Sequence, residues 1–467
     1  MNSRLPLLIL WIVLCVVTVA VYFGAFVGTF HYDDSLTILE NPHLESRQTF
    51  LGHLDHMVRP VLYATFLLDR SLYGVMPTGY HLLNLLLHLG SGLLVYRILI
   101  SAVWEQPSCV PFLTSLLFLI HPITTETVTY ISGRASGLMA FFYLLAFFFY
   151  IKASEQQENV KRRRLFLLGA VASFLFSIGS KETAVTLPMM LLLWDIWIRR
   201  LNGPALRATI RSYHSPFWVV FVFAAAWAYS HPHYTALAQF SVQIRPFWDN
   251  VLTESHAMAY AMLLFFTPWK QNFDHDLPVF HSLAQWPLPL DLLFLSAMAA
   301  GAFFARRRVP VVAFGLAWFF IQLLPTSLIP RNDLLSERNL YLPVIGLLLA
   351  IVSLGSHLVQ WLQVIVRRPA LVRIGSAVLA TALIVTLCFF TYQRNLLYRD
   401  RVLLWSDAVA KSPNKARPHN NLGYAYALRD DWDRAIEEFR TAARLDPDFL
   451  VAQQNLRDAY LHRVGLR

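Results

Sequence analysis

The sequence predicts an all-α membrane protein: a polytopic helix bundle of about eleven spans plus a re-entrant helix, followed by a small C-terminal domain of helical repeats. Three observations lead to this fold class. Of the 467 residues, 56% are hydrophobic and only 15% are charged, whereas soluble domains carry about 25% charged residues. Apolar runs long enough to cross a bilayer recur along the chain. After residue 392 the composition changes and becomes charged and water-compatible.

The first apolar segment is too long for the core of a signal peptide and lacks a small-residue cleavage site, so we interpret it as a retained span. The eleven predicted spans lie at 5–28, 80–103, 110–121, 135–151, 165–180, 183–198, 214–230, 288–305, 309–330, 340–361 and 371–392. A further apolar run covers 251–268, which we expect to form a re-entrant or interfacial helix.

Basic clusters between the spans predict the orientation, because short cytoplasmic loops are enriched in Lys and Arg. The clusters are Lys161 to Arg164; Arg199 and Arg200 with Arg207 and Arg211; Arg306 to Arg308; and Arg367 and Arg368 with Arg373. They share one side only if 251–268 does not cross. The amino terminus is then cytoplasmic and the carboxyl terminus lies outside. These loops account for the net charge of +10 without a nucleic-acid partner, and the expected surroundings are membrane lipids.

This topology places the polar clusters on the outer side. The outer segments are 29–79, 122–134, 231–250, 269–287 and 331–339, together with the polar end of the chain. The three cysteines, Cys15, Cys109 and Cys388, show neither metal-ligand spacing nor a disulfide framework, so no protein metal site is predicted.

The polar C-terminal region contains an internal repeat with a period of 34 residues. The matched pairs are Trp405 and Phe439, Ala408 and Ala442, Pro413 and Pro447, Asn421 and Asn455, Leu422 and Leu456, and Tyr426 and Tyr460. This period and pattern are typical of tetratricopeptide helix pairs. We therefore divide the chain into a membrane domain, 1–392, whose first outer loop is 29–79, and a tetratricopeptide-repeat domain, 393–467, on the outer side. About two repeats are fewer than such arrays usually need, so the repeat is expected to lean on the membrane domain or on a partner.

Two adjacent acids, Asp33 and Asp34, follow the first span directly. Charge at a membrane edge is expensive, which favours a functional interpretation. If both acids share a site of low dielectric, repulsion keeps one partly protonated and leaves the other as a candidate base. The alternative is that one acid caps a helix and the other is solvated.

Four outer loops supply cations or histidine beside these acids, as an anionic head group would require. The candidate phosphate-binding residues are Arg59, His81, Arg134, Lys181 and Arg338, and the candidate supporting residues are His121, Glu126, Glu182, Glu337 and Tyr341. Arg134 opens a predicted helix, where free N–H groups add to its charge. Structural ion pairs, such as Arg134 with Glu126, are the alternative, and binding of ordinary lipid head groups is another. Asn84 and His88, on one helix face with His81, favour interhelical hydrogen bonds.

Several short motifs occur in an order that resembles a known family. They are Tyr32-Asp33-Asp34 with Asn41-Pro42; Arg59-Pro60; Gly79-Tyr80-His81 with Asn84; His121-Pro122 with Glu126; Gly133-Arg134-Ala135; Lys181-Glu182; and Glu337-Arg338 with Tyr341-Leu342-Pro343. With the repeats, this ordered set resembles the transmembrane-and-tetratricopeptide-repeat O-mannosyltransferases and their bacterial relatives over nearly the whole chain.

The resemblance implies a class C glycosyltransferase fold, a polyprenyl-phosphate sugar as donor and a site on the non-cytoplasmic face. It also implies that the acidic motif of the first outer loop, Asp33 and Asp34 here, is catalytic. The resemblance favours mannose as the sugar. Eukaryotic members carry many repeats and this chain carries about two, so a choice of substrate that depends on a long repeat array is not carried over to it. The short repeat favours a bacterial inner membrane with the site in the periplasm, and an endoplasmic-reticulum setting is the alternative.

Together the residues and the resemblance predict sugar transfer with inversion. An aspartate takes the proton of a Ser or Thr hydroxyl on a secreted or envelope protein. The repeat helps to recruit this acceptor protein. The cations then stabilise the departing lipid phosphate. A divalent metal bridging acid and phosphate stays open. The rival functions are a transferase acting on lipid or glycan and a non-enzymatic scaffold that recruits partners through its repeat. A transporter would show paired repeats among its spans, and none is evident.

Overall fold

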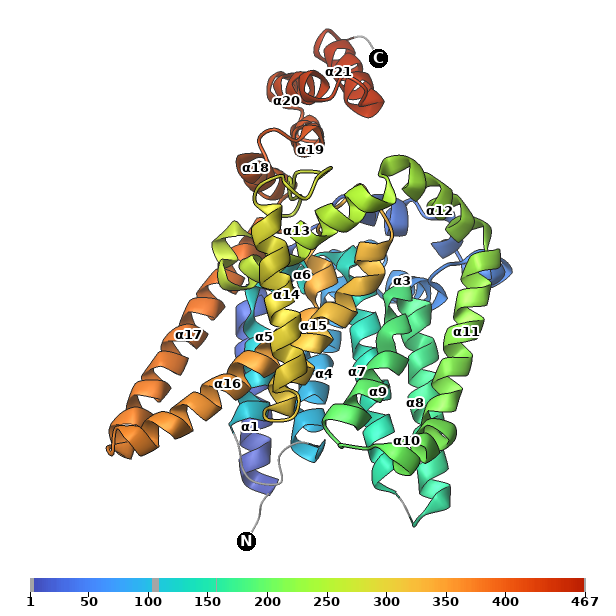
Figure 1. The fold of residues 1–467 in the computed structure, drawn as a ribbon. Coiled ribbons are helices and arrows are strands. Elements are labelled where there is room, and N and C mark those ends of the chain that lie inside the picture. Colours follow the sequence, from blue (N-terminus) through green and yellow to red (C-terminus); the bar gives the residue numbers. More distant parts are fainter. Residues whose placement is uncertain (1–3, 103–108, 157, 466–467) are drawn as a thin grey trace.

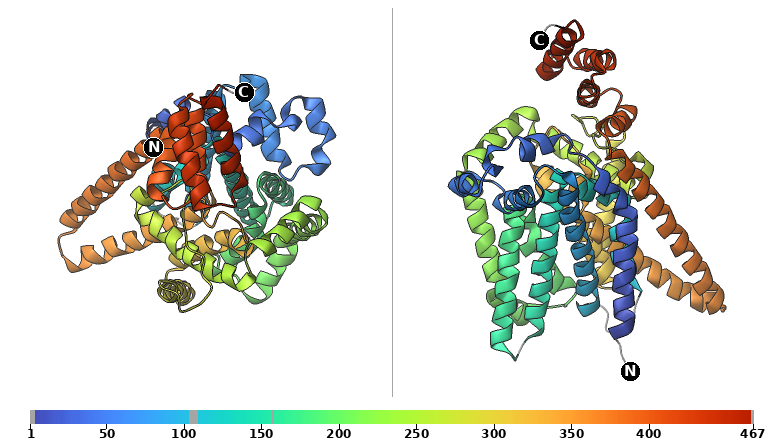
Figure 2. Two further views of the ribbon diagram at one scale, coloured as in Figure 1. Left: turned by 90° about the horizontal axis from the view of Figure 1, so that it is seen from above. Right: turned by 180° about the vertical axis from the view of Figure 1, so that it is seen from behind.

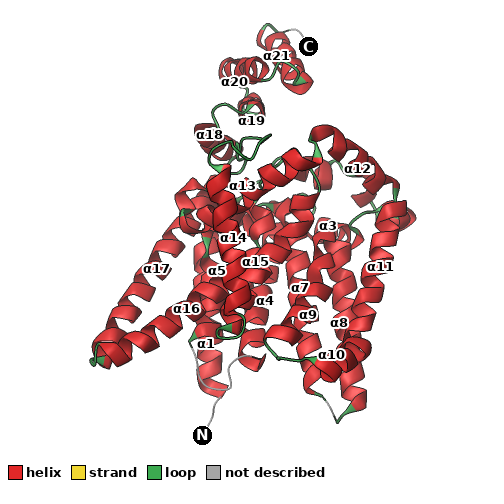
Figure 3. Ribbon diagram, in the orientation of Figure 1, coloured by secondary structure: helices red, strands yellow, loops and turns green. Residues whose placement is uncertain are grey.

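The computed structural model describes residues 4–102, 109–156 and 158–465. These residues form helices and connecting loops, with no strand among them (Figures 1 and 3). Within these described ranges, eight helical segments are long and apolar enough to cross a membrane. Their helices are α1 (Arg4–Tyr22), α4 (Pro77–Ala102), α7 (Arg134–Glu155), α8 (Val160–Ser180), α14 (Leu288–Ala305), α15 (Pro310–Leu328), α16 (Pro343–Ile365) and α17 (Pro369–Leu397). The all-α membrane bundle predicted from the sequence is confirmed.

Three shorter apolar helices stand in the same bundle: α5 (Val110–Ile120), α9 (Leu187–Trp197) and α11 (Ser215–Ser230) (Figure 1). Each of the eleven predicted spans therefore falls on a helix. α5 contributes Leu116 to Ile120 to the main apolar core, which explains how so short a run is accommodated. The number of complete crossings stays a prediction.

Proline marks where many of these helices begin. The first residue of its helix is Pro60 in α3 (Pro60–Tyr73), Pro77 in α4, Pro232 in α12 (Pro232–Ile244), Pro310 in α15, Pro343 in α16 and Pro369 in α17. Proline has no N–H and a fixed φ, and the first helical position needs no N–H donor, so this is the place where proline costs nothing. Proline thus marks helix starts that the sequence alone can locate.

The two ends of the bundle differ in composition. The turns that carry the basic clusters, between α7 and α8, after α9 into α10 (Gly203–Thr209), between α14 and α15, and between α16 and α17, lie at the end where the chain begins (Figure 1). The repeat lies at the other end. This arrangement agrees with the predicted sorting of basic and polar loops to opposite sides.

Further helices cover the end that carries the repeat. α12 and α13 (Phe247–Phe266) lie across it (Figures 1 and 2). α13 occupies the 251–268 region for which an interfacial or re-entrant helix is predicted. The first outer loop adds α2 (Arg47–Gly52) and α3 beside α12, and α6 (Thr125–Thr129) follows a 3-10 turn.

The C-terminal domain is two helix pairs, α18 (Arg401–Lys411) with α19 (Ala416–Ala427) and α20 (Trp432–Leu445) with α21 (Leu450–Arg463). Asp400 and Asp431 cap α18 and α20 through their side chains. The repeated positions Trp405 and Phe439 are both buried and anchor the cores of the two pairs. The repeat predicted from the 34-residue period is confirmed.

The crossing of α15 and α16 depends on two glycines. A Cβ atom at Gly315 would collide with the carbonyl oxygen of Gly346, and one at Gly346 with that of Gly315. Small residues let helix backbones approach closely in a membrane, where dispersion contacts replace the hydrophobic effect. This close approach fixes α16, whose first turn follows the loop that carries Glu337 and Arg338.

We expect Gly346→Ala to lower the stability of the bundle by about 1–3 kcal/mol, because the added methyl overpacks this crossing. Gly355→Ala is the matched control, since Gly355 lies in the same helix and its Cβ would meet open space. Alanine is the better helix former by about 1 kcal/mol, so the control should be neutral or stabilising. Thermal unfolding in detergent measures both, and equal melting temperatures for the two variants would contradict the account.

Candidate active site

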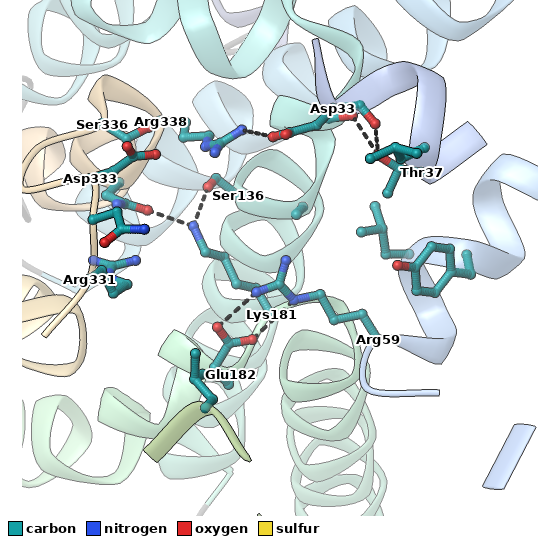
Figure 4. A pocket seen from close by; sticks show the side chains of 18 of the residues that line it. Asp33, Thr37, Arg59, Ser136, Lys181, Glu182, Arg331, Asp333, Ser336 and Arg338 are labelled. Atoms are coloured by element: carbon teal, nitrogen blue, oxygen red, sulfur yellow. Dashed lines mark hydrogen bonds and ion pairs between the residues drawn. The ribbon is translucent and has the colours of Figure 1, made fainter. Parts of the chain in front are cut away.

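A cavity of about 650 Å³ opens at the end of the bundle that carries the repeat. Its lining residues come from segments far apart in sequence, within 33–37, 59–66, 132–136, 181–182, 237–244 and 330–339, joined by Arg417 of the repeat. One part of the wall is apolar and is formed by Leu62, Phe66, Leu237, Phe240 and Ile244. Charged side chains make up another part (Figure 4). The cavity therefore suits an amphipathic ligand with a charged part and an apolar part.

Helix ends position the charged side chains of the cavity. Arg59 precedes α3, Lys181 follows α8, and Arg338 lies in a 3-10 turn (Glu337–Leu340) before α16. Each of these residues lies at or beyond a helix end, where the chain turns polar, and all three line the same cavity.

Asp33 and Asp34 point to different places. Asp33 lines the cavity with its side chain 40% exposed, and its carboxylate accepts from the Arg338 guanidinium at 3.2 Å (Figure 4). Asp34 is fully buried. Its carboxylate accepts from the backbone N–H of His31 at 2.8 Å, from that of Ser132 at 2.8 Å and from the Ser132 hydroxyl at 2.5 Å. The structure thus brings Asp33 to the cavity and makes Asp34 a structural anchor between two loops.

A left-handed turn at Tyr32 directly precedes the two acids. Tyr32 has φ of +37°, a conformation that costs an L residue about 1–3 kcal/mol and persists only when its surroundings hold it. The turn is held on its protein side by the Asp34 N–H donating to the His31 carbonyl at 2.8 Å and by the Asp33 N–H donating to the Tyr130 hydroxyl at 3.0 Å. Burial raises the pKa of Asp34 to about 7, with the negative charge of Asp33 as a smaller contribution.

Arg59 and Arg338, two of the predicted phosphate ligands, line the cavity but already have acidic partners. The Arg59 guanidinium donates two hydrogen bonds, of 3.0 and 2.8 Å, to the Glu182 carboxylate. Although burial raises the pKa of Glu182, Arg59 outweighs that effect and holds it at about 2. Arg338 contacts Asp33 and lies 3.7 Å from Glu126. These charges are largely balanced before any ligand arrives.

Arg134 and His81, two more of the five predicted phosphate ligands, are buried in the protein interior and do not line the cavity. Arg134 is completely buried and pairs with Asp69 of α3 at 2.5 Å, not with Glu126. It also donates to the Asn84 amide oxygen at 2.7 Å and to the Tyr80 carbonyl at 2.9 Å. Arg134 therefore ties α3, α4 and α7 together.

Lys181 differs from these cations. Its ammonium donates to the Ser136 hydroxyl at 2.8 Å and to the Asn339 amide oxygen at 2.7 Å, and it forms no ion pair with a described residue (Figure 4). Burial, followed by the charge of Arg59, lowers the pKa of Lys181 well below its usual range. Arg331 is the second such cation in the cavity: it donates to the Thr326 carbonyl at 2.9 Å and forms no ion pair within the described part of the chain. An anion placed between them would supply the missing negative charge.

The predicted supporting residues hold the loops in place. Glu126 is buried and accepts from Ser336 at 3.0 Å and from the Arg338 N–H at 3.2 Å. Glu337 is bound to Arg394 at 2.9 Å and to His275 at 3.0 Å. The other contacts are His121 Nε2 with the Phe265 carbonyl at 3.2 Å and Tyr341 with His88 at 2.8 Å. Hydrogen bonding between helices, expected for Asn84 and His88, is confirmed.

The acids of the cavity do not fit a divalent ion. Asp33, Glu182 and Asp333 line it, and each is paired with an arginine: Arg338, Arg59 and Arg417 respectively. No cluster of three His, Cys, Asp or Glu side chains suited to a metal occurs in the described residues.

Sequence reasoning did not single out several polar residues of the cavity, among them Ser136, Arg331 and Asp333. The run Arg331-Asn332-Asp333 lies in the same outer loop as Glu337 and Arg338, so its density of polar groups was an available signal. No sequence signal pointed to Arg417, because a basic residue is common in a charged repeat and only the fold brings this one to the cavity.

We expect Asp34→Asn to lower the free energy of unfolding by about 1–3 kcal/mol, because the new amide N–H₂ would face backbone N–H donors in a buried site. Asp33→Asn is the matched control and loses only a partly exposed ion pair, worth about 0–1 kcal/mol. Thermal unfolding of the two variants measures the difference. If Asp33→Asn proves the more destabilising, Asp34 is not the anchor.

Known proteins resemble this chain over nearly its full length. Protein O-mannosyl-transferase Tmtc3 of Drosophila melanogaster is 26% identical over 97% of this chain and 57% of its own length. Protein O-mannosyl-transferase TMTC1 of Homo sapiens is 26% identical over 92% of this chain and 54% of its own length. The human protein O-mannosyl-transferase TMTC4 is 32% identical over 28% of this chain and 22% of its own length. The chain thus spans a little over half the length of the first two relatives.

The repeat is found independently, since residues 416–449 match the tetratricopeptide repeat family. No solved structure matches the chain significantly. The resemblance inferred from the ordered motifs is confirmed: across its membrane bundle and its repeat, the chain is a homologue of the protein O-mannosyl-transferases, which are glycosyltransferases.

Proposed function

We propose that this protein transfers a sugar, mannose in the first instance, from a polyprenyl-phosphate donor to a Ser or Thr hydroxyl of a secreted or envelope protein. One observation carries the proposal: Asp33 shares a single cavity with Lys181 and Arg331, two cations without an acidic partner among the described residues. A base for the acceptor and a receptor for the leaving phosphate are the two groups that this reaction needs. The names of the relatives support the same chemistry.

The reaction is a single displacement. The acceptor hydroxyl gives its proton to Asp33 as its oxygen forms a bond to the anomeric carbon. The bond from that carbon to the phosphate oxygen breaks, and its electron pair stays on the phosphate. Attack opposite the leaving group inverts the configuration. Because a phosphate leaves without protonation, no second carboxylic acid is needed, in contrast to glycoside hydrolysis.

Lys181 and Arg331 receive the charge that develops on the phosphate. Cations fixed in a partly desolvated site act more strongly than they would in water, and they need no reorganisation as the bond breaks. Ser136 and Asn339 orient the Lys181 ammonium. Arg338 holds the Asp33 carboxylate by their 3.2 Å ion pair until the acceptor hydroxyl replaces this contact.

The apolar wall gives the lipid part of the donor a place to lie. Leu237, Phe240 and Ile244 come from α12, and Leu62 and Phe66 from α3. Phe240 is 51% exposed, as expected for a surface that meets acyl or prenyl chains. The donor would enter sideways from the membrane with its phosphate at the level of Lys181.

The basic loops at the opposite end of the bundle support a site on the non-cytoplasmic face. The repeat lies at the cavity end, where it meets an exported acceptor protein. The bacterial inner membrane, with the cavity in the periplasm, remains the predicted location.

The first test measures transfer from polyprenyl-phosphate mannose to a Ser/Thr-rich peptide by purified protein. We expect Asp33→Asn to lower kcat by at least about 100-fold, since removal of a general base costs roughly 10²–10⁴ in rate. Circular dichroism and melting temperature should stay unchanged. Full transfer by Asp33→Asn would remove the base assignment, and transfer to lipid or glycan alone would replace the acceptor.

The second test addresses the phosphate. Lys181→Met should lower kcat by roughly 10²-fold or more, because a charge-stabilising donor is lost. Lys181→Arg should retain part of the rate. Wild-type activity should fall as pH rises through the lowered pKa of Lys181, while Lys181→Arg should stay active there, because arginine remains protonated. Lys152→Met, a lysine paired with Glu155 at the other end of α7, is the control. Equal activity of Lys181→Met and this control would contradict the role.

A further inference from the structure

We propose that the first repeat aims the catalytic aspartate. Trp405 of α18 and Arg417 of α19 hold the ring of Tyr32, and this grip maintains the left-handed turn that points Asp33 into the cavity. The inference rests on the proposed role of Asp33 as the base. It makes the repeat part of the catalytic apparatus and not only a surface for recruiting proteins.

The contacts to Tyr32 come from both helices of the first repeat. The Trp405 ring meets the Tyr32 ring edge to face, with centroids 5.7 Å apart. The Arg417 guanidinium lies 5.9 Å from the centre of the same ring. Tyr32 is otherwise 42% exposed, although it carries the strained φ of +37°. Aromatic pairs and cation–π contacts of this kind are attractive. The repeat therefore stabilises the conformation of Tyr32 on the exposed side of the turn.

The repeat is itself firmly fixed to the membrane domain. Asp274 is buried in the loop after α13 and forms ion pairs with Lys415 at 2.7 Å and with Arg417 at 2.5 Å. The Ser412 hydroxyl donates to the Asp274 carbonyl at 2.7 Å. Trp405 is 4% exposed and packs edge to face on Phe273 at 5.2 Å. Trp405 and Arg417 are therefore rigid supports and not mobile surface groups.

The junction is packed and does not form a binding cleft. The space left among Tyr32, Phe273, Trp405 and Arg417 is about 20 Å³, which is the room for about one water molecule. A sugar or an acceptor side chain does not fit. What these side chains do is restrain one another, and Tyr32 is the member next to Asp33.

The turn is thus held at both of its ends. On one side Asp34 is fixed inside the protein by three hydrogen bonds. On the other side the repeat holds Tyr32. Asp33 lies between these restraints. Release of Tyr32 would let the turn relax toward the right-handed region and swing Asp33 away from the bound donor, and a small misplacement of a reacting group costs up to about 100-fold in rate.

The experiment is a double-mutant cycle on full-length protein, with kcat and KM measured for donor and acceptor. Trp405→Leu should lower kcat roughly 10- to 100-fold with the donor KM unchanged, and Trp405→Phe should restore most of the rate because it keeps an aromatic face. Trp432→Leu is the control, since Trp432 stacks on His462 in the second repeat. Its kcat should match that of wild type.

Tyr32 variants keep the inference testable if Trp405→Leu disturbs the repeat itself. Glycine adopts positive φ without strain and valine resists it, so Tyr32→Gly should lower kcat less than Tyr32→Val. In the Tyr32→Gly background, Trp405→Leu should have an effect below about threefold, because glycine no longer needs the grip. An undiminished effect in that background, or wild-type kcat in Trp405→Leu, would overturn the inference.

The cycle separates this inference from the proposed function. If Asp33→Asn is inactive and Trp405→Leu has normal kcat, the base assignment stands and the repeat does not aim it. If Asp33→Asn is fully active, the base assignment fails, and with it the inference that depends on it.

Discussion

The constraint on which this structure depends is the cost of charge next to lipid. A cation or an acid at the membrane edge must find a partner, because desolvation costs several kcal/mol for an unpaired ion. Arg134 with Asp69, Arg59 with Glu182 and Arg338 with Asp33 meet this requirement within the protein. Lys181 and Arg331 meet it only in part, through neutral hydrogen-bond acceptors. A phosphate would complete the balance, so under the proposed function this unfavourable arrangement in the free protein becomes the binding site for the donor.

The same constraint explains why the site lies at helix ends. Within the spans, the helices satisfy the backbone groups and most side chains are apolar, so an open cavity lined by charges is favoured only beyond them. Just beyond them, the first polar residues meet loops that supply free N–H groups. Asp34 uses the N–H groups of His31 and Ser132 to join the first outer loop to the start of α7. The bundle thus brings polar residues from distant parts of the chain together at one end of the helices.

Much of this organisation follows from the sequence. The spans are readable from apolar runs, the repeat from its 34-residue period, and the convergence of polar loops from the positions of the basic clusters. The sequence does not reveal which acid faces the cavity, because that depends on a single left-handed residue, Tyr32. It does not reveal which cations are already neutralised either. Arg134 pairs with Asp69, 65 positions earlier, and Arg59 with Glu182, 123 positions later, and such long-range pairings are set by helix packing and not by local pattern.

The contact between the repeat and the membrane domain also follows from packing. Two helix pairs bury too little apolar surface to stand alone, and longer arrays solve this with more repeats and a capping unit. Here the membrane domain takes the part of the cap. The loop after α13 presents Asp274 and Phe273 to α18 and α19, and Lys415, Arg417 and Trp405 bind them. The first pair therefore gains its missing neighbour from the membrane domain, and the second pair stacks on the first. A repeat stabilised in this way cannot move independently of the loops beside the cavity, so anything that strains the first pair is felt at Tyr32 and, one residue later, at Asp33.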